Sequence, residues 1–315
     1  MSEYRGRFAP TPSGDLHFGS LVCALGSYLR AKTARGTWLV RIDDVDTPRV
    51  VPGAADRILR ALEAHGLEWD EAITYQSRQY PAYREACDRL WKQGHLYRCD
   101  CTRKQIAVKA RRGPEGPVYP GWCANRLVPP LEGATRARTQ GLKISWTDML
   151  QGRQERDFGT TLGDYVVWRR DSVCSYHLAT VVDDFANGIS EVVRGADLLF
   201  STDRQIHLQG ALALPRPAYL HLPLALLPSG EKLSKQSGAA ALDPDRAALS
   251  LIRALRFLGQ APGRELELAH PKTVLDWALA NWSLARVPQT PGYSFAVGGR
   301  GAGEFPATGV RGIKS

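Results

Sequence analysis

No stretch constrains the fold of this chain more than residues 9–21, "APTPSGDLHFGSL". Its prolines and glycines would be costly inside a helix or a strand, so the stretch is predicted to be a shaped loop. A helix is expected to follow, because apolar residues recur at helical spacing at Leu21, Val22, Leu25, Tyr28 and Leu29. A loop that ends in His17 and Gly19 at a helix start can bind an anion with its unpaired amides and the helix dipole. An ordinary Pro-Gly loop with a structural histidine is the alternative.

The order of the predicted elements favours an α/β fold with a parallel sheet. We expect helices at 55–66, 81–94, 245–258 and about 272–284, with one more ending near 214. We expect strands at 37–43, 164–170, 177–184 and 189–195, and a strand followed by a polar loop within 220–238. Between about 97 and 160 the apolar period weakens and Gly, Pro and Arg accumulate, which is typical of an inserted module. The glycine-rich segment from Val287 onward has no apolar period and is predicted to be mobile.

The net charge of +9 favours a polyanionic partner such as nucleic acid. Much of it lies in residues 99–156, which hold eleven Lys and Arg against five Asp and Glu. This segment either contacts nucleic acid or is a solvated basic face. Six cysteines are too few for a disulfide scaffold, and no apolar run is long enough for a signal or a membrane span. We therefore expect a cytoplasmic protein with reduced thiols and no membrane partner.

A second candidate motif is "EKLSKQ" at 231–236. Lys232 and Lys235, on either side of Ser234 in a loop after a glycine, could hold a polyphosphate between them. Pairs of surface lysines are common, however, and this motif alone does not indicate a function.

Taken together, the two motifs resemble a known family. "PTPSGDLHFGS" is similar to the HIGH motif and "KLSKQ" to the KMSKS motif of class I aminoacyl-tRNA synthetases. "LVRIDDVD", "YHLATVVDDFANGISEVVRGADLL" and "LHLPLALLPSGEKLSK" resemble the glutamyl-type enzymes, in the same order, over roughly residues 5–240. Little of the chain follows Lys235, too little for the domains with which glutamyl-tRNA synthetases contact the anticodon. The resemblance is therefore strongest to the short branch, the glutamyl-queuosine tRNA(Asp) synthetases.

The resemblance implies a Rossmann-type catalytic domain from residues 1–96 and 160–215, interrupted by a zinc-bearing, acceptor-contact insertion at 97–159. A KMSKS loop and a helical stem-contact region at 216–286 would follow, and then a flexible tail at 287–315. It also implies a ligase, expected to be a monomer, that activates L-glutamate with ATP and Mg²⁺ without tRNA. The glutamate would then be transferred to queuosine at the wobble position of tRNA(Asp).

For glutamate, a pocket needs cations for two carboxylates and an anion for the ammonium. The resemblance supplies Arg7 and Arg194 as the cations, Asp43 as the anion and Tyr176 as a hydroxyl donor. It adds Phe8, Ala9, Pro10 and Thr11 as further contacts. Taken singly, each arginine could equally be a surface ion pair, and Asp43 a helix cap. The family usually has Glu where Asp43 stands, so the ammonium contact could run through water or be shared with Asp44.

For ATP, the resemblance implies contacts from both motifs, namely Pro10, His17, Gly19, Ser20, Ser234 and Lys235. His17 and Lys235 would stabilise the charge that develops at the α-phosphate, and Lys232 would act on the leaving pyrophosphate. Ser20 stands where the HIGH motif has its second histidine, and Leu233 replaces the methionine of KMSKS. Both departures are tolerated among glutamyl-type enzymes.

Three cysteines, Cys99, Cys101 and Cys123, lie within 25 residues of one another. Zinc requires about four ligands, most often thiolates and imidazoles, so the residues alone leave open a metal site or unrelated thiols. The resemblance supplies Tyr119 as the fourth ligand of a structural zinc, with His95 as the competing candidate. Cys23, Cys87 and Cys174 are expected to be inert core residues.

Three other functions remain open from the sequence. A truncated glutamyl-tRNA synthetase would use the same adenylation site but charge the 3′ end of a tRNA. A small-molecule nucleotidyltransferase of the HxGH type would need neither the paired arginines nor the zinc insertion. A non-catalytic RNA-binding relative would have no need of His17, Lys232 and Lys235.

Overall fold

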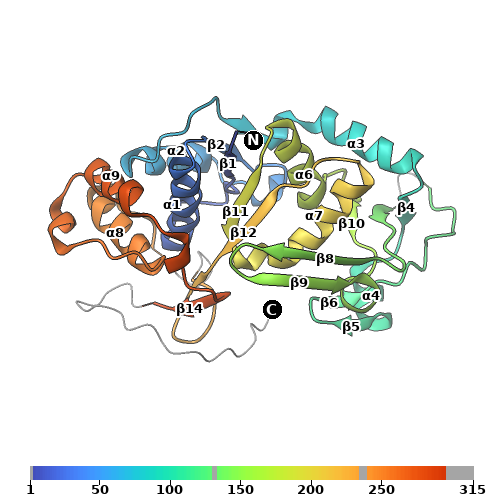
Figure 1. The fold of residues 1–315 in the computed structure, drawn as a ribbon. Helices are drawn as coiled ribbons and strands as arrows, with labels where there is room; N and C mark the ends of the chain where they lie inside the picture. Colours follow the sequence, from blue (N-terminus) through green and yellow to red (C-terminus); the bar gives the residue numbers. More distant parts are fainter. Residues whose placement is uncertain (1–2, 130–132, 234–239, 296–315) are drawn as a thin grey trace.

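The computed structural model describes residues 3–129, 133–233 and 240–295. Its centre is a set of parallel strands (Figure 1). β1 (Arg5–Phe8) pairs with β2 (Thr37–Ile42), and β2 pairs with the short β3 (Thr74–Tyr75). β11 (Glu191–Gly195) pairs in parallel with β12 (Ala218–Leu222) and lies beside β1, where Ser190 N–H donates to the Arg5 carbonyl. The expected α/β fold with a parallel sheet is confirmed.

The phosphate-loop candidate lies between β1 and α1 (Phe18–Thr33). His17 is the N-cap of this helix, and its Nδ1 accepts from Gly19 N–H at 3.1 Å. The predicted apolar stripe of α1 is buried against the sheet, with Leu21, Leu25 and Leu29 fully inaccessible. The helix ends before Gly36, where any Cβ would collide with the Tyr4 carbonyl. Only glycine allows the chain to turn into β2 at that point.

The other helices of the catalytic region agree with the predicted ranges within a few residues. They are α2 (Ala54–Ala64), α3 (Tyr80–Lys92) and α7 (Leu199–Ala211). At one end of the molecule α8 (Ala247–Phe257) and α9 (Pro271–Asn281) pack next to α1 (Figure 1). Leu251 and Leu255 of α8 belong to the same core cluster as Leu25 and Leu29 of α1. The C-terminal helices thus complete the core on one face of the sheet.

The segment between α3 and α6 is built from short strands, most of them at the opposite end, while its hairpin β8–β9 reaches back to β12, where Met149 N–H donates to the Tyr219 carbonyl (Figure 1). β4 (Leu96–Cys99) and β10 (Val166–Trp168) flank β7 (Ala134–Ala137) in an antiparallel sheet. Two hairpins, one helix of seven residues and one of four complete the segment: β5 (Arg111–Gly113) with β6 (Gly116–Val118), β8 (Lys143–Asp148) with β9 (Gly152–Asp157), α4 (Arg103–Lys109) and α5 (Phe158–Thr161). The segment therefore leaves the catalytic region after β4 and rejoins it after β10, and these two strands lie on either side of β7 in one sheet.

One predicted strand is wrong. Residues 177–184 lie in a helix, α6 (Tyr176–Ala186), with Ser175 as its N-cap accepting from Leu178 N–H. The β-branched pair Val181 and Val182 favoured a strand. Helical spacing decided the outcome instead, because it buries Leu178 and Val181 in the core that α6 shares with α3 and α7.

The predicted mobile tail begins too early. Residues 292–294 form β14 (Gly292–Ser294), which pairs in parallel with β13 (Leu224–Leu226). Tyr293 stacks on Phe257 with ring centroids 4.5 Å apart. The absence of an apolar period hid this strand, since its stability comes from contacts with residues distant in sequence. Residues 296–315 lie outside the described part of the chain. Among the described residues, no helix is long and apolar enough to cross a membrane.

Candidate active site

A cavity of about 290 Å³ opens at the carboxyl ends of the central strands. Its lining includes Thr11 from the loop after β1, Asp43 directly after β2 and Tyr176 at the start of α6. In a parallel α/β sheet ligands bind at this edge. The fold therefore brings three of the residues expected at a glutamate site to one cavity, although they are spread over more than half of the chain. The Pro10 carbonyl ties two of these loops together by accepting Asp43 N–H at 2.9 Å.

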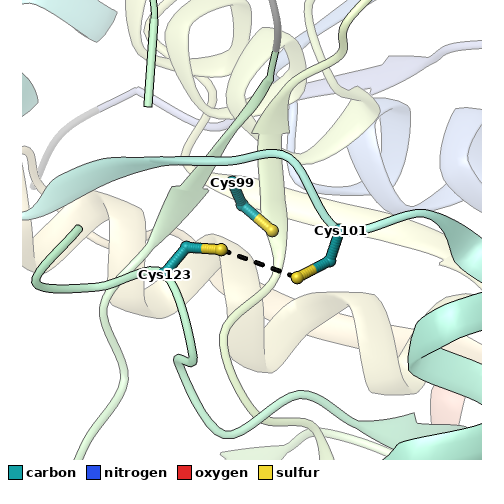
Figure 2. A group of neighbouring side chains, drawn as sticks. All are labelled: Cys99, Cys101 and Cys123. Carbon is teal, nitrogen blue, oxygen red and sulfur yellow. Dashed lines mark hydrogen bonds between the residues drawn. The ribbon is translucent and has the colours of Figure 1, made fainter. Parts of the chain in front are cut away.

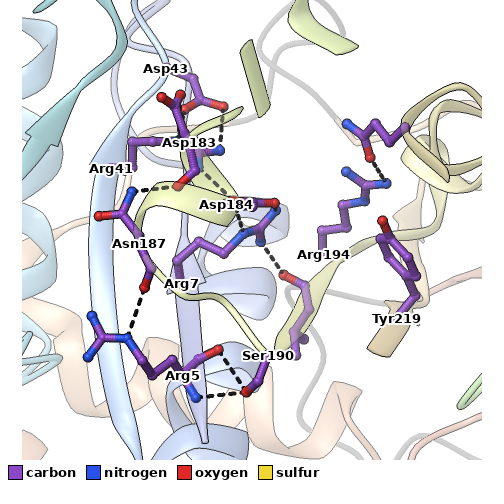
Figure 3. A network of polar contacts seen from close by, with 12 residues as sticks. Arg5, Arg7, Arg41, Asp43, Asp183, Asp184, Asn187, Ser190, Arg194 and Tyr219 are labelled. Carbon is purple, nitrogen blue, oxygen red and sulfur yellow. Dashed lines mark hydrogen bonds and ion pairs between the residues drawn. The ribbon is translucent and has the colours of Figure 1, made fainter. Parts of the chain in front are cut away.

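Beneath this cavity lies a buried cluster of charges, which we call the carboxylate cluster: Arg7, Arg41, Asp43, Asp183 and Asp184 (Figure 3). Arg7 Nε donates to Asp184 Oδ1 at 3.0 Å, and Arg41 Nη1 donates to the same oxygen at 2.6 Å. Arg41 Nε also donates to Asp43 Oδ1 at 2.7 Å. Arg7, predicted to be a glutamate cation, is thus already paired with a carboxylate, and so is Asp43 with a guanidinium.

The cluster sets the protonation of its members. Burial raises the pKa of Asp43, and Arg41 opposes this only in part. Burial also acts on Asp184, but the two guanidinium groups of Arg7 and Arg41 outweigh it and hold its pKa below the usual value. Asp183 is different, because burial raises its pKa to about 6. Ion pairing with two arginines therefore keeps Asp184 ionised deep in the protein.

Arg194, the second predicted glutamate cation, lies in different surroundings, which we call the Arg194 site. It is 5% exposed, and its partners are neutral groups. Nε lies 3.0 Å from His221 Nε2, Nη1 donates to Tyr176 Oη at 3.3 Å, and Nη2 donates to Thr202 Oγ1 and Gln205 Oε1 at 2.7 and 2.8 Å. No carboxylate among the described residues forms an ion pair with Arg194. A buried cation without a counter-ion is costly unless a ligand supplies one.

Sequence reasoning missed Arg41, Gln76 and His177. Gln76 and His177 line the cavity. Gln76 Oε1 and His177 Nδ1 are buried and have no hydrogen-bond partner in the described part of the chain. Such atoms are rare in native proteins and often mark a place where a ligand or water binds. For Arg41 a signal existed, since an arginine inside the apolar run "TWLVRI" needs a buried acid. Asp44, which could share the ammonium contact with Asp43, has other partners. It accepts from Ser77 N–H and Oγ–H at 2.7 Å each.

The two motif loops approach each other in the structure. The Leu233 carbonyl lies 3.6 Å from where a Cβ on Gly19 would sit, and Ala241 forms an isolated β-bridge with His17. Leu242 N–H donates to the Leu16 carbonyl at 2.9 Å. The described residues on either side of 234–239 thus lie near His17 and Gly19, while Ser234 and Lys235 lie outside the described residues. Lys232 Nζ is 2.6 Å from Asp197 Oδ2 at the surface.

The remaining residues of the predicted site lie at the end of β1, in the loop after it and in the first turn of α1. Phe8 is buried at the end of β1, Ala9 and Pro10 lead into the loop, and Ser20 lies in the first turn of α1 beside Gly19. His17 Nδ1 accepts a backbone N–H, so the neutral imidazole carries its proton on Nε2. That N–H is a suitable donor to a phosphate oxygen.

The three predicted cysteines converge (Figure 2). The Sγ atoms of Cys99, Cys101 and Cys123 all lie within 4.8 Å of one another. Tyr119 Oη lies 3.2 Å from Cys99 Sγ and 3.5 Å from Cys101 Sγ, and accepts from Cys123 N–H at 3.2 Å. The group contains no histidine among the described residues, so His95 is not part of it. Three thiols and a phenol oxygen around one point are a donor set that suits zinc.

Comparison with known proteins places this geometry in a family. The model for the catalytic domain of class I tRNA synthetases (E and Q) matches residues 3–118 and 133–287. The glutamyl-Q tRNA(Asp) synthetase of Dechloromonas aromatica is 52% identical over 291 residues, which cover 91% of this chain and 97% of that protein. The chain belongs to the glutamyl-Q tRNA(Asp) synthetases. The proteins of the same name from Synechococcus and Pseudomonas aeruginosa are 50% and 46% identical, each over 91% of this chain.

Solved structures support the class I synthetase fold. The glutamate-tRNA synthetase of Elizabethkingia anophelis superposes with a TM-score of 0.78 and 26% identity, covering 94% of this chain but 68% of that one. A glutamate tRNA ligase from Elizabethkingia meningosepticum, crystallised with its amino acid, gives a TM-score of 0.76 and 26% identity over 92% of this chain and 66% of its own. The resemblance inferred from the motifs is confirmed, and so is the class I synthetase fold.

Proposed function

We propose that this chain activates L-glutamate with ATP without tRNA and transfers it to queuosine at the wobble position of tRNA(Asp). The observation that carries the proposal is the Arg194 site, a buried cation next to a cavity that contains Thr11, Asp43 and Tyr176. Its relatives are named glutamyl-Q tRNA(Asp) synthetases, and it spans almost their whole length. A carboxylate ligand would supply the counter-ion that the described residues do not give Arg194.

In the proposed first step, the α-carboxylate of glutamate attacks the α-phosphorus of ATP in line, and pyrophosphate leaves. The glutamate side-chain carboxylate binds Arg194 and Tyr176, and its ammonium lies at Asp43. His17 Nε2–H donates to a phosphate oxygen, Lys235 and Lys232 neutralise charge on the phosphates, and ATP enters as its magnesium complex. Pro10, Gly19, Ser20 and Ser234 would line the nucleotide. The products are glutamyl-adenylate and pyrophosphate.

In the second step, a hydroxyl of the queuosine cyclopentenediol attacks the activated carbonyl, and AMP leaves. The hydroxyl proton goes to a base or to the substrate phosphate. The competing function is that of a glutamyl-tRNA synthetase, in which the terminal adenosine of a tRNA supplies the hydroxyl. The same adenylation site serves both, and only the acceptor distinguishes them.

The acceptor is tested with labelled glutamate, ATP and tRNA(Asp) with or without queuosine, each with and without its 3′-terminal adenosine. Removing the adenosine is preferable to periodate treatment, because periodate also cleaves the cis-diol of queuosine. We expect label only on queuosine-containing RNA, regardless of the 3′ end. Label that requires the terminal adenosine would replace this function with tRNA charging.

We also propose that Cys99, Cys101, Tyr119 and Cys123 bind one structural zinc ion. The insertion around them has a small core of its own, built on Tyr97, Ile106 and the ligand residues themselves. Metal analysis of chelator-free protein should find one zinc per chain, and Cys101→Ser should reduce it. Cys87→Ser, outside the group, is the matched control. Protein without zinc, or equal zinc in both variants, would remove this site. The domain boundaries, the monomeric state and the cytoplasmic location remain predictions.

A further inference from the structure

One buried carboxylate of the insertion, Asp148, contacts the catalytic strands at His221 of β12. Asp148 ends β8 and is 1% exposed. Its Oδ1 accepts from the backbone N–H groups of Leu150, Gln151 and His221 at 2.9, 2.8 and 3.2 Å. Its Oδ2 lies 2.6 Å from His221 Nδ1. Burial disfavours the ionised form, but the hydrogen bonds from His221 and the backbone outweigh this and lower the pKa of Asp148. The carboxylate is therefore ionised and held in one orientation.

His221, the next-to-last residue of β12, connects this carboxylate to Arg194. Its side chain is fully buried, and its Nε2 faces Arg194 Nε at 3.0 Å. A guanidinium has only donors, so Nε2 must accept, and the ring proton must lie on Nδ1 facing Asp148. Burial and the charge of Arg194 lower the pKa of His221 to about 4, although the Asp148 hydrogen bond opposes them. At neutral pH the imidazole is therefore uncharged and in a single tautomer.

The chain of contacts decides which way Arg194 presents its donors. Nε–H is directed to His221, and Nη2 is directed to Thr202 and Gln205 on α7. Nη1 remains on the side of Tyr176, which lines the cavity. If His221 Nε2 carried the proton, it could donate to Thr202 Oγ1 at 3.2 Å, but it would oppose Arg194 Nε–H, and the guanidinium would have to turn away.

We propose that Asp148 and His221 are positioning residues for glutamate: Asp148 holds the tautomer of His221 that aligns Arg194 with the substrate carboxylate. The proposal rests on the proposed function, because it takes Arg194 as the carboxylate-binding residue. It also gives the β8–β9 hairpin of the insertion a part in amino-acid binding. Without the hairpin, Nε2 of His221 would still contact Thr202 Oγ1 at 3.2 Å and Arg194, but Nδ1 would lose Asp148, its acceptor among the described residues.

Asp148→Asn removes the charge of the carboxylate and changes the tautomer of His221, while the side chain keeps nearly the same size and shape. The Asn carbonyl can still accept from the three backbone N–H groups, while its amide N–H faces His221 Nδ1. That nitrogen must then accept, so the ring proton moves to Nε2 and opposes Arg194 Nε–H. Asp164→Asn is the matched control. Asp164 is also a buried carboxylate, 8% exposed, that accepts from Thr139 and Tyr97 and has no contact with Arg194.

The experiment measures glutamate-dependent ATP–pyrophosphate exchange for the wild type, Asp148→Asn, Asp164→Asn and Arg194→Lys. We expect Asp148→Asn to raise the KM for glutamate on the order of 10- to 100-fold, with the KM for ATP changed less than about 2-fold. Asp164→Asn should leave both constants within about 2-fold. Nitrogen-15 NMR of labelled histidines should show His221 as the Nδ1–H tautomer in the wild type and as Nε2–H in Asp148→Asn, with the signal assigned by its loss in His221→Gln.

The outcomes distinguish this proposal from the proposed function. If Arg194→Lys raises the KM for glutamate but Asp148→Asn does not, the positioning role is wrong and the function stands. If Arg194→Lys also has no effect, the assignment of Arg194 to the substrate carboxylate is wrong. Equal increases of the KM for ATP and the KM for glutamate in Asp148→Asn would indicate a structural role alone. Should Asp148→Asn fail to fold, the wild-type spectrum decides, because an Nε2–H tautomer there contradicts the proposal.

Discussion

The carboxylate cluster and the Arg194 site lie close together around the central strands, yet they differ in the partners they give a buried arginine (Figure 3). In the carboxylate cluster, Arg7 and Arg41 each donate to Asp184, and their charges are balanced inside the protein. Arg194 is equally buried but has hydroxyl, amide and imidazole partners. Burial is the same in both cases, and the difference lies in what neutralises the charge.

This contrast assigns different functions to residues that look equivalent in the sequence. A guanidinium that is already paired contributes mainly to the stability of the strands it joins. A buried guanidinium without a counter-ion is held ready for an anion that arrives with the substrate, and its partners orient it without cancelling its charge. We therefore expect the removal of Arg194 to affect glutamate first, and the removal of Arg7 to affect folding first.

The largest expected effect is that of Arg194→Met. Removing the guanidinium of the Arg194 site should lower kcat/KM for glutamate in pyrophosphate exchange by about 100- to 1,000-fold, since a charged hydrogen-bonded contact is worth a few kcal/mol. Thermal unfolding should change little, because the substitution also removes a buried charge. A variant with near-normal kcat/KM would show that the two sites do not differ in function.

Arg7→Met should instead reduce the free energy of unfolding by about 3 kcal/mol, because it breaks a buried ion pair on Asp184. Urea unfolding monitored by tryptophan fluorescence measures this. The kcat/KM for glutamate of the folded variant should fall less than that of Arg194→Met. A larger loss in kcat/KM with unchanged stability would reverse the comparison.

The contributions of Asp183, in the carboxylate cluster, and of His221, at the Arg194 site, to the free energy of unfolding should change with pH in opposite directions. The pKa of Asp183 is raised from 3.8 to about 6, so its contribution to stability is full below pH 3.8 and is lost as the pH rises to 6. The pKa of His221 is lowered from 6.5 to about 4, so its contribution is full above pH 6.5 and is lost as the pH falls to 4.

Urea unfolding of the wild type, Asp183→Asn and His221→Gln between pH 4 and 6.5 checks this. Lowering the pH should increase the stability of the wild type relative to Asp183→Asn and decrease it relative to His221→Gln. If the difference in the free energy of unfolding between the wild type and each variant did not vary with pH in this range, the assigned pKa shifts would be contradicted.

The smallest effect is expected for Asp44→Asn. Asp44 is hydrogen-bonded to Ser77, so its loss should change the KM for glutamate less than about 2-fold. Asp43→Asn, in the cavity, should raise that KM at least about 10-fold if it binds the substrate ammonium. Equal effects of the two substitutions would mean that the ammonium contact is shared.

Local signals in the sequence predicted most of the fold. The loop before α1 is marked by prolines and glycines, and the helices by apolar periods, so both depended on neighbours within the same segment. The helix at 176–186 was missed because β-branched residues outweighed its period, and β14 was missed because Tyr293 is stabilised by Phe257, far away in sequence.

The candidate site was predictable only as a set of residue types. The sequence marked Arg7, Asp43 and Arg194, but their partners are remote: Asp184 lies 177 residues from Arg7, and Asp148 lies 73 residues from His221. The local sequence around Arg7 and Arg194 does not report which of the two meets a carboxylate. That distinction arises only when the strands are assembled, and it is what separates a structural ion pair from a ligand site.

The account is tested most directly by a crystal structure of the protein with glutamate and a non-hydrolysable ATP analogue. The central claim predicts the side-chain carboxylate about 2.8 Å from Arg194 Nη1, with the Arg7–Asp184 pair intact. A glutamate whose carboxylates both lie away from Arg194, with the guanidinium still bound only to His221, Thr202, Gln205 and Tyr176, would contradict it.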